Sequence, residues 1–320
     1  MELLHAGGTA WASLLLALLA DAAWGEPEWL YRRLPHPIVA IGRGVALLER
    51  ALYPRTVSAR LRRAAGIALL LATIGTALLL GTTLARWCSN VPGGWLLEGL
   101  LMSTLLAQRS LVTHVRAVAD GLRSGLRQGR AAVAHIVGRD PERLDAAGVG
   151  RAAVESLAEN LSDGVVAPLF WGVVAGLPGM LAYKALNTLD SMVGHRSERY
   201  REFGWASARL DDLANLVPAR LTGVLVCLVG GRPRRSLRTM LRDAPRHRSP
   251  NAGWPEAAMA GALDLRLAGP RVYGGRPVAD GWMGDGSAEV GPAAIGRGIT
   301  LAWRVWWLVV AGTAWLALTV

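Results

Sequence analysis

Blocks of apolar residues about twenty positions long alternate with polar connections along the 320-residue chain. A helix of about twenty residues spans a hydrocarbon core of roughly 30 Å, so each block is a candidate membrane helix. The pattern therefore predicts an all-α, polytopic integral membrane protein with about five to six membrane-embedded helices and long polar cytoplasmic connections. The blocks cover residues 3–20, 64–84, 94–111, 165–183, 213–229 and 299–320.

The fourth block is the least regular of these. It contains Pro168, Pro178 and several glycines, and residues 184–212, which follow it, carry balanced positive and negative charge. Orientation is decided by an excess of arginine and lysine, so these residues do not decide it. The block is either a full span or a broken or re-entrant helix that lines a cavity.

Arginine is unevenly distributed, and its distribution predicts the orientation of the chain. The net charge is +11, and residues 25–63, 116–151 and 230–297 are strongly basic. Basic connections lie on the cytoplasmic side, where they face anionic lipid. Nucleic acid is not an expected partner, because no basic run is interleaved with aromatic residues that stack on bases. We expect a multi-pass protein of the cell (inner) membrane whose partner is the lipid bilayer.

No internal repeat or low-complexity tract divides the sequence, which predicts a single membrane-embedded domain over residues 1–320. The glycine- and proline-rich residues 269–298 are expected to form a loop. The domain has four consecutive segments: N-terminal spans and a basic loop in residues 1–111, a motif-rich core in 112–230, a basic loop in 231–298 and a C-terminal span in 299–320.

Three acidic residues of the motif-rich core, Glu155, Glu159 and Asp163, lie four positions apart. On a helix this spacing forms one acidic stripe, with Arg151 one turn earlier on nearly the same face. Carboxylates at this spacing repel one another, and bound Mg²⁺, which prefers a few carboxylates plus phosphate oxygens, would relieve the repulsion. The alternative interpretation is a solvated helix face.

Lys184 is the only lysine in the chain, since every other residue of this charge type is arginine. A sequence that favours arginine so strongly is expected to keep a lysine where a compact ammonium points at one phosphate or activated carboxylate. Asn187 and Asp190 follow at intervals of three, so a helix would place them on neighbouring turns. Chance retention of the lysine is the alternative.

Asp211 and Asp212 run directly into the fifth apolar block, which also contains Arg220, and Asp212 pairs with Asn215 at an interval of three. Ionisable groups within a membrane are energetically unfavourable, and they are functional candidates for that reason. A solvated helix end is the alternative. If three such polar helix ends converge, they would make a pocket for magnesium and phosphate.

Two further segments are candidates for substrate contacts. Arg246 and His247 precede the turn that contains Asn251, and they are suited to anionic groups of a substrate. His36 lies between two prolines, which hold it on a rigid extended segment. A solvated loop and a structural turn, respectively, are the alternatives.

These residues belong to motifs that follow one another in a fixed order. The motifs are Gly25-Glu26-Pro27 with Pro35-His36-Pro37, Val137-Gly138-Arg139-Asp140, Arg151-Ala-Ala-Val-Glu155, residues 163–171, residues 183–194, residues 207–220 and Ser249-Pro-Asn-Ala-Gly253. Together they resemble the adenosylcobinamide-phosphate synthases of cobalamin biosynthesis, the CobD/CbiB membrane proteins, over most of the chain. Glu26 stands where that family usually has Asp. His195 stands where it often has Tyr, which argues against a catalytic role for His195.

The resemblance implies an acid–amine ligase. The family joins the free propionate of adenosylcobyric acid to (R)-1-amino-2-propanol, or to its O-phosphate, as an amide, with ATP consumed. On this hypothesis Lys184 and Arg151 neutralise the transferring phosphoryl charge, and Asp211 deprotonates the attacking ammonium. Magnesium and the ATP phosphates would be held by Glu155, Glu159, Asp163, Asp190 and Asp212, and the substrates by His36, Asn187, Arg220, Arg246, His247 and Asn251.

Two other classes of protein remain open. A magnesium-dependent membrane prenyl- or phosphoalcohol transferase would need two DxxxD motifs, whereas the pairs Asn187/Asp190 and Asp212/Asn215 are both three positions apart. A non-enzymatic membrane sensor would not need so many polar groups beside its spans. Association with other membrane enzymes of the corrinoid pathway is a further expectation from the resemblance.

Overall fold

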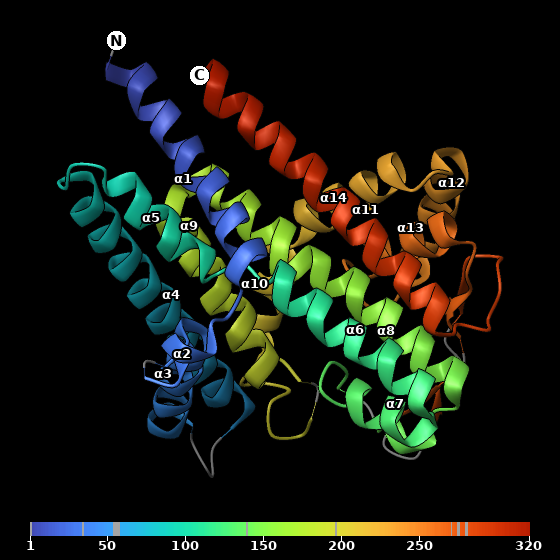
Figure 1. Ribbon diagram of the computed structural model, residues 1–320. Helices are drawn as coiled ribbons and strands as arrows, with labels where there is room; N and C mark the ends of the chain where they lie inside the picture. Colours follow the sequence, from blue (N-terminus) through green and yellow to red (C-terminus); the bar gives the residue numbers. More distant parts are fainter. Residues whose placement is uncertain are drawn as a thin grey trace. The chain divides into compact units, whose positions relative to one another are not determined.

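The computed structural model describes residues 2–33, 35–53, 58–138, 140–195, 197–269, 271–273, 276–278 and 281–320, so Arg139 lies outside the described residues. Most of this chain is α-helical, which confirms the all-α prediction (Figure 1). The chain forms two compact units from interleaved segments, and the segment 112–230 contributes to both. The first unit comprises Met1–Ala107, Ala167–Asn215 and Gly312–Val320, and the second comprises Gln108–Val166 and Leu216–Ala311.

In the first unit, α4 packs along α9, and α1 packs against α5. The N-cap of α4 is Ser58, whose hydroxyl accepts a hydrogen bond from the Leu61 amide, as serine does at helix starts. The helices of this unit are α1 (Glu2–Trp24), α2 (Glu28–Tyr31), α3 (Pro37–Leu52), α4 (Ala59–Ser89), α5 (Gly94–Ser103), α9 (Ala167–Val193), α10 (Trp205–Ala214) and the end of α14 (Pro292–Thr319).

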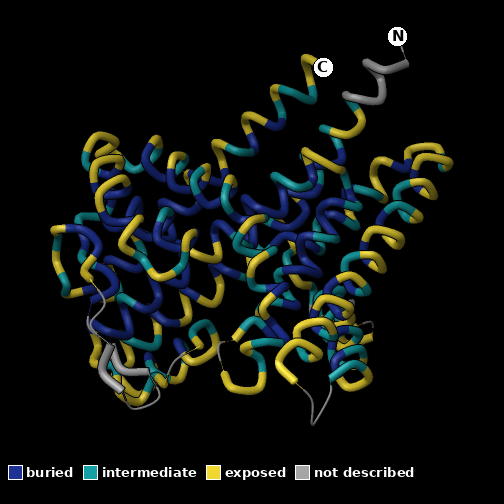
Figure 2. Tube along the Cα trace, turned by 180° about the vertical axis from the view of Figure 1, so that it is seen from behind, coloured by how far each residue is buried: buried dark blue, intermediate teal, exposed yellow. Residues whose placement is uncertain are grey.

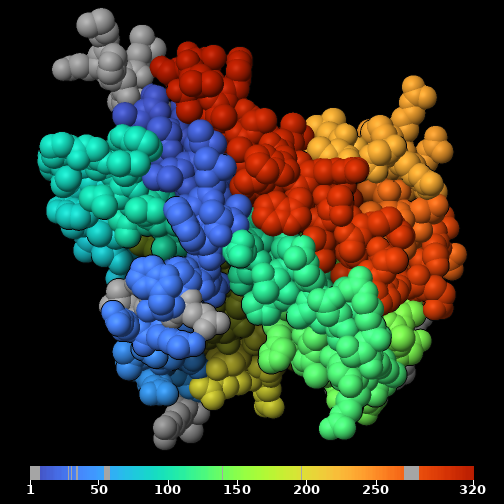
Figure 3. Space-filling model, viewed as in Figure 1, coloured from blue at the N-terminus to red at the C-terminus, as the bar shows by residue number. Residues whose placement is uncertain are grey.

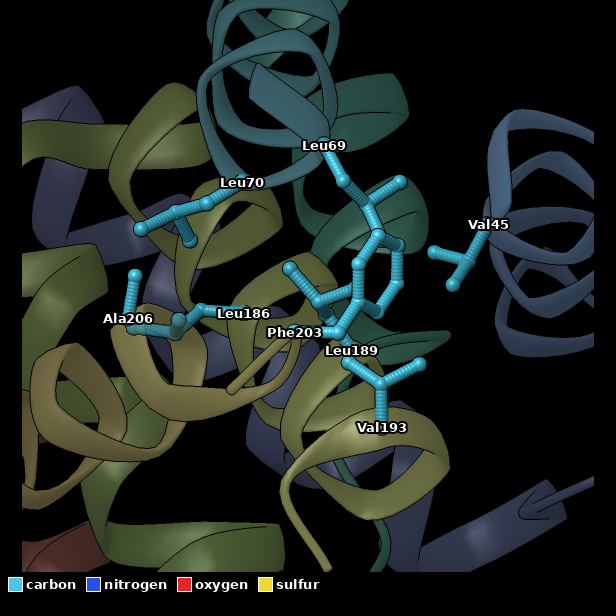
Figure 4. Close-up of a cluster of buried hydrophobic side chains, with 8 residues drawn as sticks. All are labelled: Val45, Leu69, Leu70, Leu186, Leu189, Val193, Phe203 and Ala206. Carbon is cyan, nitrogen blue, oxygen red and sulfur yellow. The ribbon is translucent and has the colours of Figure 1, made fainter. Parts of the chain in front are cut away.

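Phe203, in the loop between α9 and α10, is the largest buried side chain of the apolar core of the first unit. It packs with Leu69 of α4 and Leu189 of α9 (Figure 4). A methyl group added at Gly66 of α4 would lie 1.8 Å from the Phe203 carbonyl oxygen, so only glycine permits this close approach. The contact fixes the loop against α4 and thereby positions the start of α10.

The fourth apolar block forms a broken helix, as one of the two expectations had it. Within α9, Ala175 has φ −143° and Gly176 has φ +61°, and Pro178 follows two residues later. Proline disfavours the α conformation in the residue before it and lacks an amide donor, and glycine readily adopts positive φ. The break lies within the apolar part of α9, well before the polar residues at its C-terminal end.

In the second unit, α8 is buried along most of its length, and α13, also largely buried, packs against α11 and α12. The expected loop at residues 269–298 is partly wrong, because β1 pairs antiparallel with β4, and β2 pairs antiparallel with β3. The elements of this unit are α6 (Gln108–Ser124), α7 (Leu126–Val133), η1 (Pro141–Arg143), α8 (Ala146–Leu161), the π-helical turn η2 (Ser162–Val166), α11 (Leu216–Val229), α12 (Pro233–Asp243), η3 (Ala244–Arg246), α13 (Gly253–Leu263), β1 (Leu267–Ala268), β2 (Arg271–Tyr273), β3 (Arg276–Val278), β4 (Trp282–Met283) and most of α14.

Among the described residues, three helical stretches are long and apolar enough to cross a membrane, namely Ala59–Ser89, Ala146–Val193 and Pro292–Thr319. The broken pair α10 and α11 would make a fourth, and Gly8–Trp24 is a shorter apolar helix. The prediction of one span over residues 94–111 is wrong, because α5 ends at Ser103 and α6 begins at Gln108. Its sequence has polar residues from Gln108 onward, and the apolar positions of α6 lie on one face that is buried in the protein.

The surface of α14 carries the tryptophans expected at a membrane interface. Trp306 is buried, and its ring packs edge-on against those of Trp303 and Trp307, at centroid distances of 5.3 Å and 4.5 Å. Trp307 is 60% exposed, and the outer face of α14 is open to the surroundings (Figure 3, red). The last turns of the chain are mostly exposed (Figure 2). An exposed indole beside a buried one suits a helix that enters the headgroup layer.

Candidate active site

Most of the predicted site residues of the first unit lie at the C-terminal end of α9 and on α10. The α9–α10 polar cluster consists of Lys184, Asn187 and Asp190 on α9, Asp211 and Asp212 on α10, and Asn215 at the C-cap of α10. Lys184 is only 6% exposed and Asn215 only 2%. The two helices pack against each other, so the two motifs meet in space although more than a dozen residues separate them in the sequence.

Asp211 is held by hydrogen bonds from two asparagines. Its Oδ2 accepts from Asn215 Nδ2 at 3.0 Å, and it also accepts from the side chain of Asn187. The predicted pairing of Asn215 with Asp212 is therefore replaced by a pairing with Asp211, one residue earlier, because an interval of four also faces one side of a helix. Asp212 Oδ2 instead lies 4.0 Å from Arg209 Nη1.

Tyr183 completes this network from α9. Its hydroxyl donates to Asn215 Oδ1 at 2.9 Å, and both residues are buried. Because the Tyr183 hydroxyl donates to the carbonyl oxygen of the Asn215 amide, the NH₂ group of this amide faces Asp211. The tyrosine therefore fixes the orientation of the Asn215 side-chain amide. Neither Tyr183 nor Asn215 was among the predicted site residues. The signal available in the sequence was that both lie within the motifs quoted above, where Asn215 was paired with Asp212 and Tyr183 had no predicted partner.

Two carboxylates of the cluster have an unsatisfied oxygen. Within the described part of the chain, Asp190 Oδ1 and Asp211 Oδ1 are each buried and accept no hydrogen bond. Their negative charges act on each other and on that of Asp212. Buried polar atoms normally have partners, and an exception is a candidate position for a catalytic role, a water or an ion. The donor set of carboxylate oxygens fits Mg²⁺, which commonly uses one or two carboxylates plus phosphate oxygens.

His36 lies close enough to Lys184 to sense its charge. Its Nδ1 accepts a hydrogen bond from the Ile38 amide at 3.2 Å and caps the start of α3. Burial lowers the pKa of His36 below its usual value, and the ammonium of Lys184 acts in the same direction, although Glu26 acts against both. A neutral imidazole is needed for the capping bond, so Nε2 is the ring nitrogen available to a substrate.

The acidic residues of α8 lie in the second unit and have different surroundings. Glu155 is buried, and its Oε1 accepts a hydrogen bond from the Ala268 amide at 2.8 Å, which anchors β1 to α8. Glu159 is exposed. Asp163 belongs to the π-helical turn, where the wider turn changes the register. The predicted single stripe therefore holds only within α8.

Arg151 also contacts the chain beyond α13. Its Nη1 donates to the Ala288 carbonyl oxygen at 2.8 Å, and its guanidinium lies 5.6 Å from the ring centroid of Trp282. Like Glu155, it attaches residues that follow α13 to α8. The assignments of Arg151 to phosphoryl charge and of the α8 carboxylates to metal stay predictions.

The predicted substrate contacts on α11 and near α13 come together in the second unit. The Arg220 guanidinium lies 4.4 Å from the ring centroid of Trp254 and contacts Asn251 Oδ1 at 3.5 Å. His247 Nε2 lies 3.9 Å from Glu256 Oε1. Arginine, histidine and an amide thus share one region, and this region could receive an anionic group.

Arg246 belongs to a second ion-pair group around Asp243. Its side chain is 69% exposed and lies 3.7 Å from Asp243 Oδ1. Arg242 binds the same carboxylate with two nitrogens, each at 2.7 Å, and the Gly284 amide donates to it at 2.8 Å. Burial alone would raise the pKa of Asp243, but these hydrogen bonds hold it below its usual value. The carboxylate thereby ties α12 to the segment after β4.

No preformed group of three or more histidine, cysteine, aspartate or glutamate side chains that could hold a metal occurs among the residues that the structure describes. The cysteines Cys88 and Cys227 are free and buried, as expected for small apolar residues.

The fold and the polar cluster define a helical integral membrane protein with ionisable side chains at the ends of its membrane helices. The chain belongs to the CobD/Cbib protein family, which it matches over residues 14–302. This confirms the resemblance inferred from the motifs. Family membership gives the chain a role in cobalamin biosynthesis.

Several relatives carry the name "Cobalamin biosynthesis protein CobD". The one from Rhodobacter capsulatus is 52% identical over 294 residues, which cover 91% of this chain and 92% of the relative. One from a Sinorhizobium species is 51% identical over 297 residues, with 90% and 92% coverage. The one from Sinorhizobium fredii is 49% identical over 315 residues, with 95% and 96% coverage. No solved structure matches the chain.

Proposed function

We propose that the chain is an ATP-dependent acid–amine ligase of the inner membrane. It joins the free propionate of adenosylcobyric acid to (R)-1-amino-2-propanol or its O-phosphate. The observation that carries this proposal is the α9–α10 polar cluster, in which a buried lysine and an oriented aspartate with an unpartnered oxygen occur together. A cation can neutralise charge on a transferring phosphoryl group, and a carboxylate can accept the proton of the attacking amine.

The first step converts the propionate into a species with a good leaving group. A propionate oxygen attacks the γ-phosphorus of ATP, the bond from that phosphorus to the bridging oxygen breaks, and ADP leaves with the electron pair. The Lys184 ammonium would neutralise charge on the transferring phosphoryl group. Its burial supports this role, because electrostatic interactions are stronger where water is excluded.

The second step forms the amide. The amine nitrogen attacks the acyl carbon, the bond from that carbon to the phosphate oxygen breaks, and inorganic phosphate leaves. Asp211 Oδ1 would accept the proton that the nitrogen loses, since this oxygen has no other partner while Oδ2 is held by Asn215. Asn187 and Asn215 fix the carboxylate for this transfer.

Magnesium would be held by Asp190 and Asp212, beside Asp211, and when bound it would supply charge neutralisation for the ATP phosphates. In the second unit, Arg220, His247 and Asn251 are suited to an anionic group of a substrate, and Arg246 is exposed enough to join them. Glu159 of α8 and Asp163 of η2 remain candidates for magnesium.

The proposal is tested with the full-length protein in membranes. Adenosylcobyric acid, ATP and Mg²⁺ are supplied together with either (R)-1-amino-2-propanol or its O-phosphate. The amide product and ADP are measured. Asp211→Asn is expected to lower the rate at least about 100-fold. Asp120→Asn is the matched control, because Asp120 is an exposed residue of α6 that pairs with Arg123, and it should keep the full rate.

Three outcomes would overturn the proposal. Product formed without ATP would exclude this chemistry, and a product in which a prenyl or phosphoalcohol group has been transferred would favour the rival enzyme class. The gene can also be tested for its ability to restore a strain that is blocked between cobyric acid and cobinamide. No product in the membrane assay, together with no restoration of this strain, would favour the sensor.

A further inference from the structure

A cleft of about 730 Å³ lies in the second unit, and none of its lining residues is one of the site residues discussed above. It is lined by the N-terminal half of α14, the end of α13 and the turn between α11 and α12. We call it the α14 cleft. Arg232, Arg297 and Arg304 are its basic lining residues, and all three are exposed.

Two of these arginines come from one face of α14. Arg297 and Arg304 are seven residues apart, which is two helical turns, so both side chains reach the same cleft. Within the described part of the chain, neither guanidinium forms an ion pair. Arg304 belongs to a stretch long and apolar enough to span a membrane, where an arginine needs an anionic partner or an aqueous cavity.

The acidic lining residues do not cancel this charge. Asp264 accepts hydrogen bonds from Arg232 and is also paired with Arg235, and these interactions hold the pKa of Asp264 below its usual value. The negative charge of Asp264 is thus already paired with Arg232 and Arg235. Glu289 is exposed at the rim and is the one lining acid that would repel an anion.

Apart from Ser287 and Thr300, the rest of the lining is apolar. Ala262, Leu265 and Leu301 are buried and line the cleft below the arginines. The tryptophans Trp303 and Trp307 flank Arg304 in sequence, and tryptophans of this kind lie at headgroup depth. The basic segment 230–297, which contains Arg232, is expected on the cytoplasmic side, where the lipid is anionic. A ligand with one phosphate group and an apolar remainder matches such a lining.

We propose that the α14 cleft binds the phosphate group of an anionic phospholipid of the cytoplasmic leaflet. Arg297 and Arg304 contact the phosphate, and the lipid chains pass over the apolar lining toward the hydrocarbon core. A free phosphate offers the same charge to the arginines but leaves the apolar lining without a partner. The lipid therefore accounts for both parts of the cleft.

The test uses the purified full-length protein in a neutral detergent, titrated with phosphatidylglycerol and, separately, with phosphatidylcholine. Native mass spectrometry gives the fraction of protein with bound lipid. Each of Arg297→Gln and Arg304→Gln is expected to weaken phosphatidylglycerol binding about fivefold. Glu289→Gln is expected to strengthen it, because it removes the repelling carboxylate. Arg238→Gln, an exposed arginine of α12 outside the cleft, is the matched control and should change nothing.

Opposite effects of the arginine and glutamate variants would not arise from a loss of folding, which would weaken binding in all of them. Equal binding of both lipids, or unchanged binding in Arg304→Gln, would overturn the proposal. Inorganic phosphate is added as a competitor in a further arm. Displacement of phosphatidylglycerol by an equimolar amount of phosphate would overturn the assignment to lipid and identify a site for free phosphate.

Discussion

The hydrogen bond between Tyr183 and Asn215 gives the sharpest test of how the α9–α10 polar cluster is built. Tyr183 is 3% exposed and Asn215 is 2% exposed, and the bond between them measures 2.9 Å. Tyr183→Phe removes the hydroxyl that donates to the buried Asn215 Oδ1, and Asn215→Leu removes the acceptor of this bond. Removing one partner of a buried hydrogen bond costs about 1–3 kcal/mol.

The double variant Tyr183→Phe/Asn215→Leu removes both polar groups at once. Replacing both partners of a buried hydrogen bond by apolar groups is nearly neutral for that bond. We therefore expect the double variant to be about 1 kcal/mol more stable than the sum of the single effects. This value lies within the maximum of about 1.7 kcal/mol for couplings between membrane helices. Asn215→Leu also removes a donor to Asp211, so it should be the more harmful single change.

The two free cysteines provide the assay. Cys88 lies in the first unit and Cys227 in the second, and both are buried. In a Cys227→Ala background, a dye that fluoresces on reaction with thiols reports the heat unfolding of the first unit alone. A change of 1 kcal/mol should shift the midpoint by about 2–4 °C in a unit of this size.

Additivity would refute the reasoning. If the double variant loses the sum of the single effects to within about 0.5 kcal/mol, the two side chains do not share an interaction. The comparison pair is Tyr183→Phe with Ser13→Ala. The Ser13 hydroxyl donates to the Trp95 carbonyl oxygen and to Glu98 Oε2, and not to Tyr183 or Asn215, so that pair should be additive.

Three further predictions concern packing, charge and pH. Gly66→Ala should destabilise the first unit by about 3 kcal/mol, because its methyl group would lie 1.8 Å from a backbone oxygen. Gly75→Ala on the same helix is the control, since its methyl group would have nothing within 4 Å and the change should be neutral or stabilising. Thermal unfolding midpoints distinguish the two variants. Lys184→Arg should lower amide formation about 100-fold in the membrane assay, and full activity would disprove the lysine argument. The pKa of Asp243 in the folded state is depressed. Its stabilising contribution is therefore present above the usual aspartate pKa of about 4 and is lost as the pH falls below that value. Between about pH 7 and pH 3, the unfolding midpoint of Asp243→Asn should fall less than that of the unsubstituted protein.

The apolar pattern predicted helix positions well where tertiary contacts agree with it. The second and sixth blocks became α4 and α14, and the prolines and glycines of the fourth block correctly indicated a break in α9. The third block failed because apolar content alone does not separate a membrane span from a helix buried on one face. Gln108 is completely buried at the start of α6, and only the packing of α6 in its unit explains why.

The site shows the same division between local and distant information. Sequence spacing singled out Asn187, Asp190, Asp211 and Asp212 as polar residues near helix ends, and the packing of α9 against α10 brings these two helices together. Spacing identifies neighbours on one helix, but intervals of three and four are both allowed, so it paired Asn215 with the wrong aspartate. Tyr183, on another helix, orients the Asn215 amide so that it bonds to Asp211 and not to Asp212. No pattern within one motif contains that information.

The division into two units also decides which substitutions test the chemistry. Lys184, Asp190 and Asp211 lie together in the first unit, and within the described part of the chain Asp190 Oδ1 and Asp211 Oδ1 accept no hydrogen bond that a substitution would break. Arg151 and Glu155 instead hold backbone groups of the segment after α13, so replacing them disturbs the second unit whatever else they do. Loss of activity in an Arg151 or Glu155 variant is therefore ambiguous unless the same thiol assay in a Cys88→Ala background, in which Cys227 reports on the second unit, shows that this unit is intact. A change confined to Asp211 Oδ1, such as Asp211→Asn, alters proton acceptance while the hydrogen bonds to Oδ2 can persist, and it separates catalysis from folding.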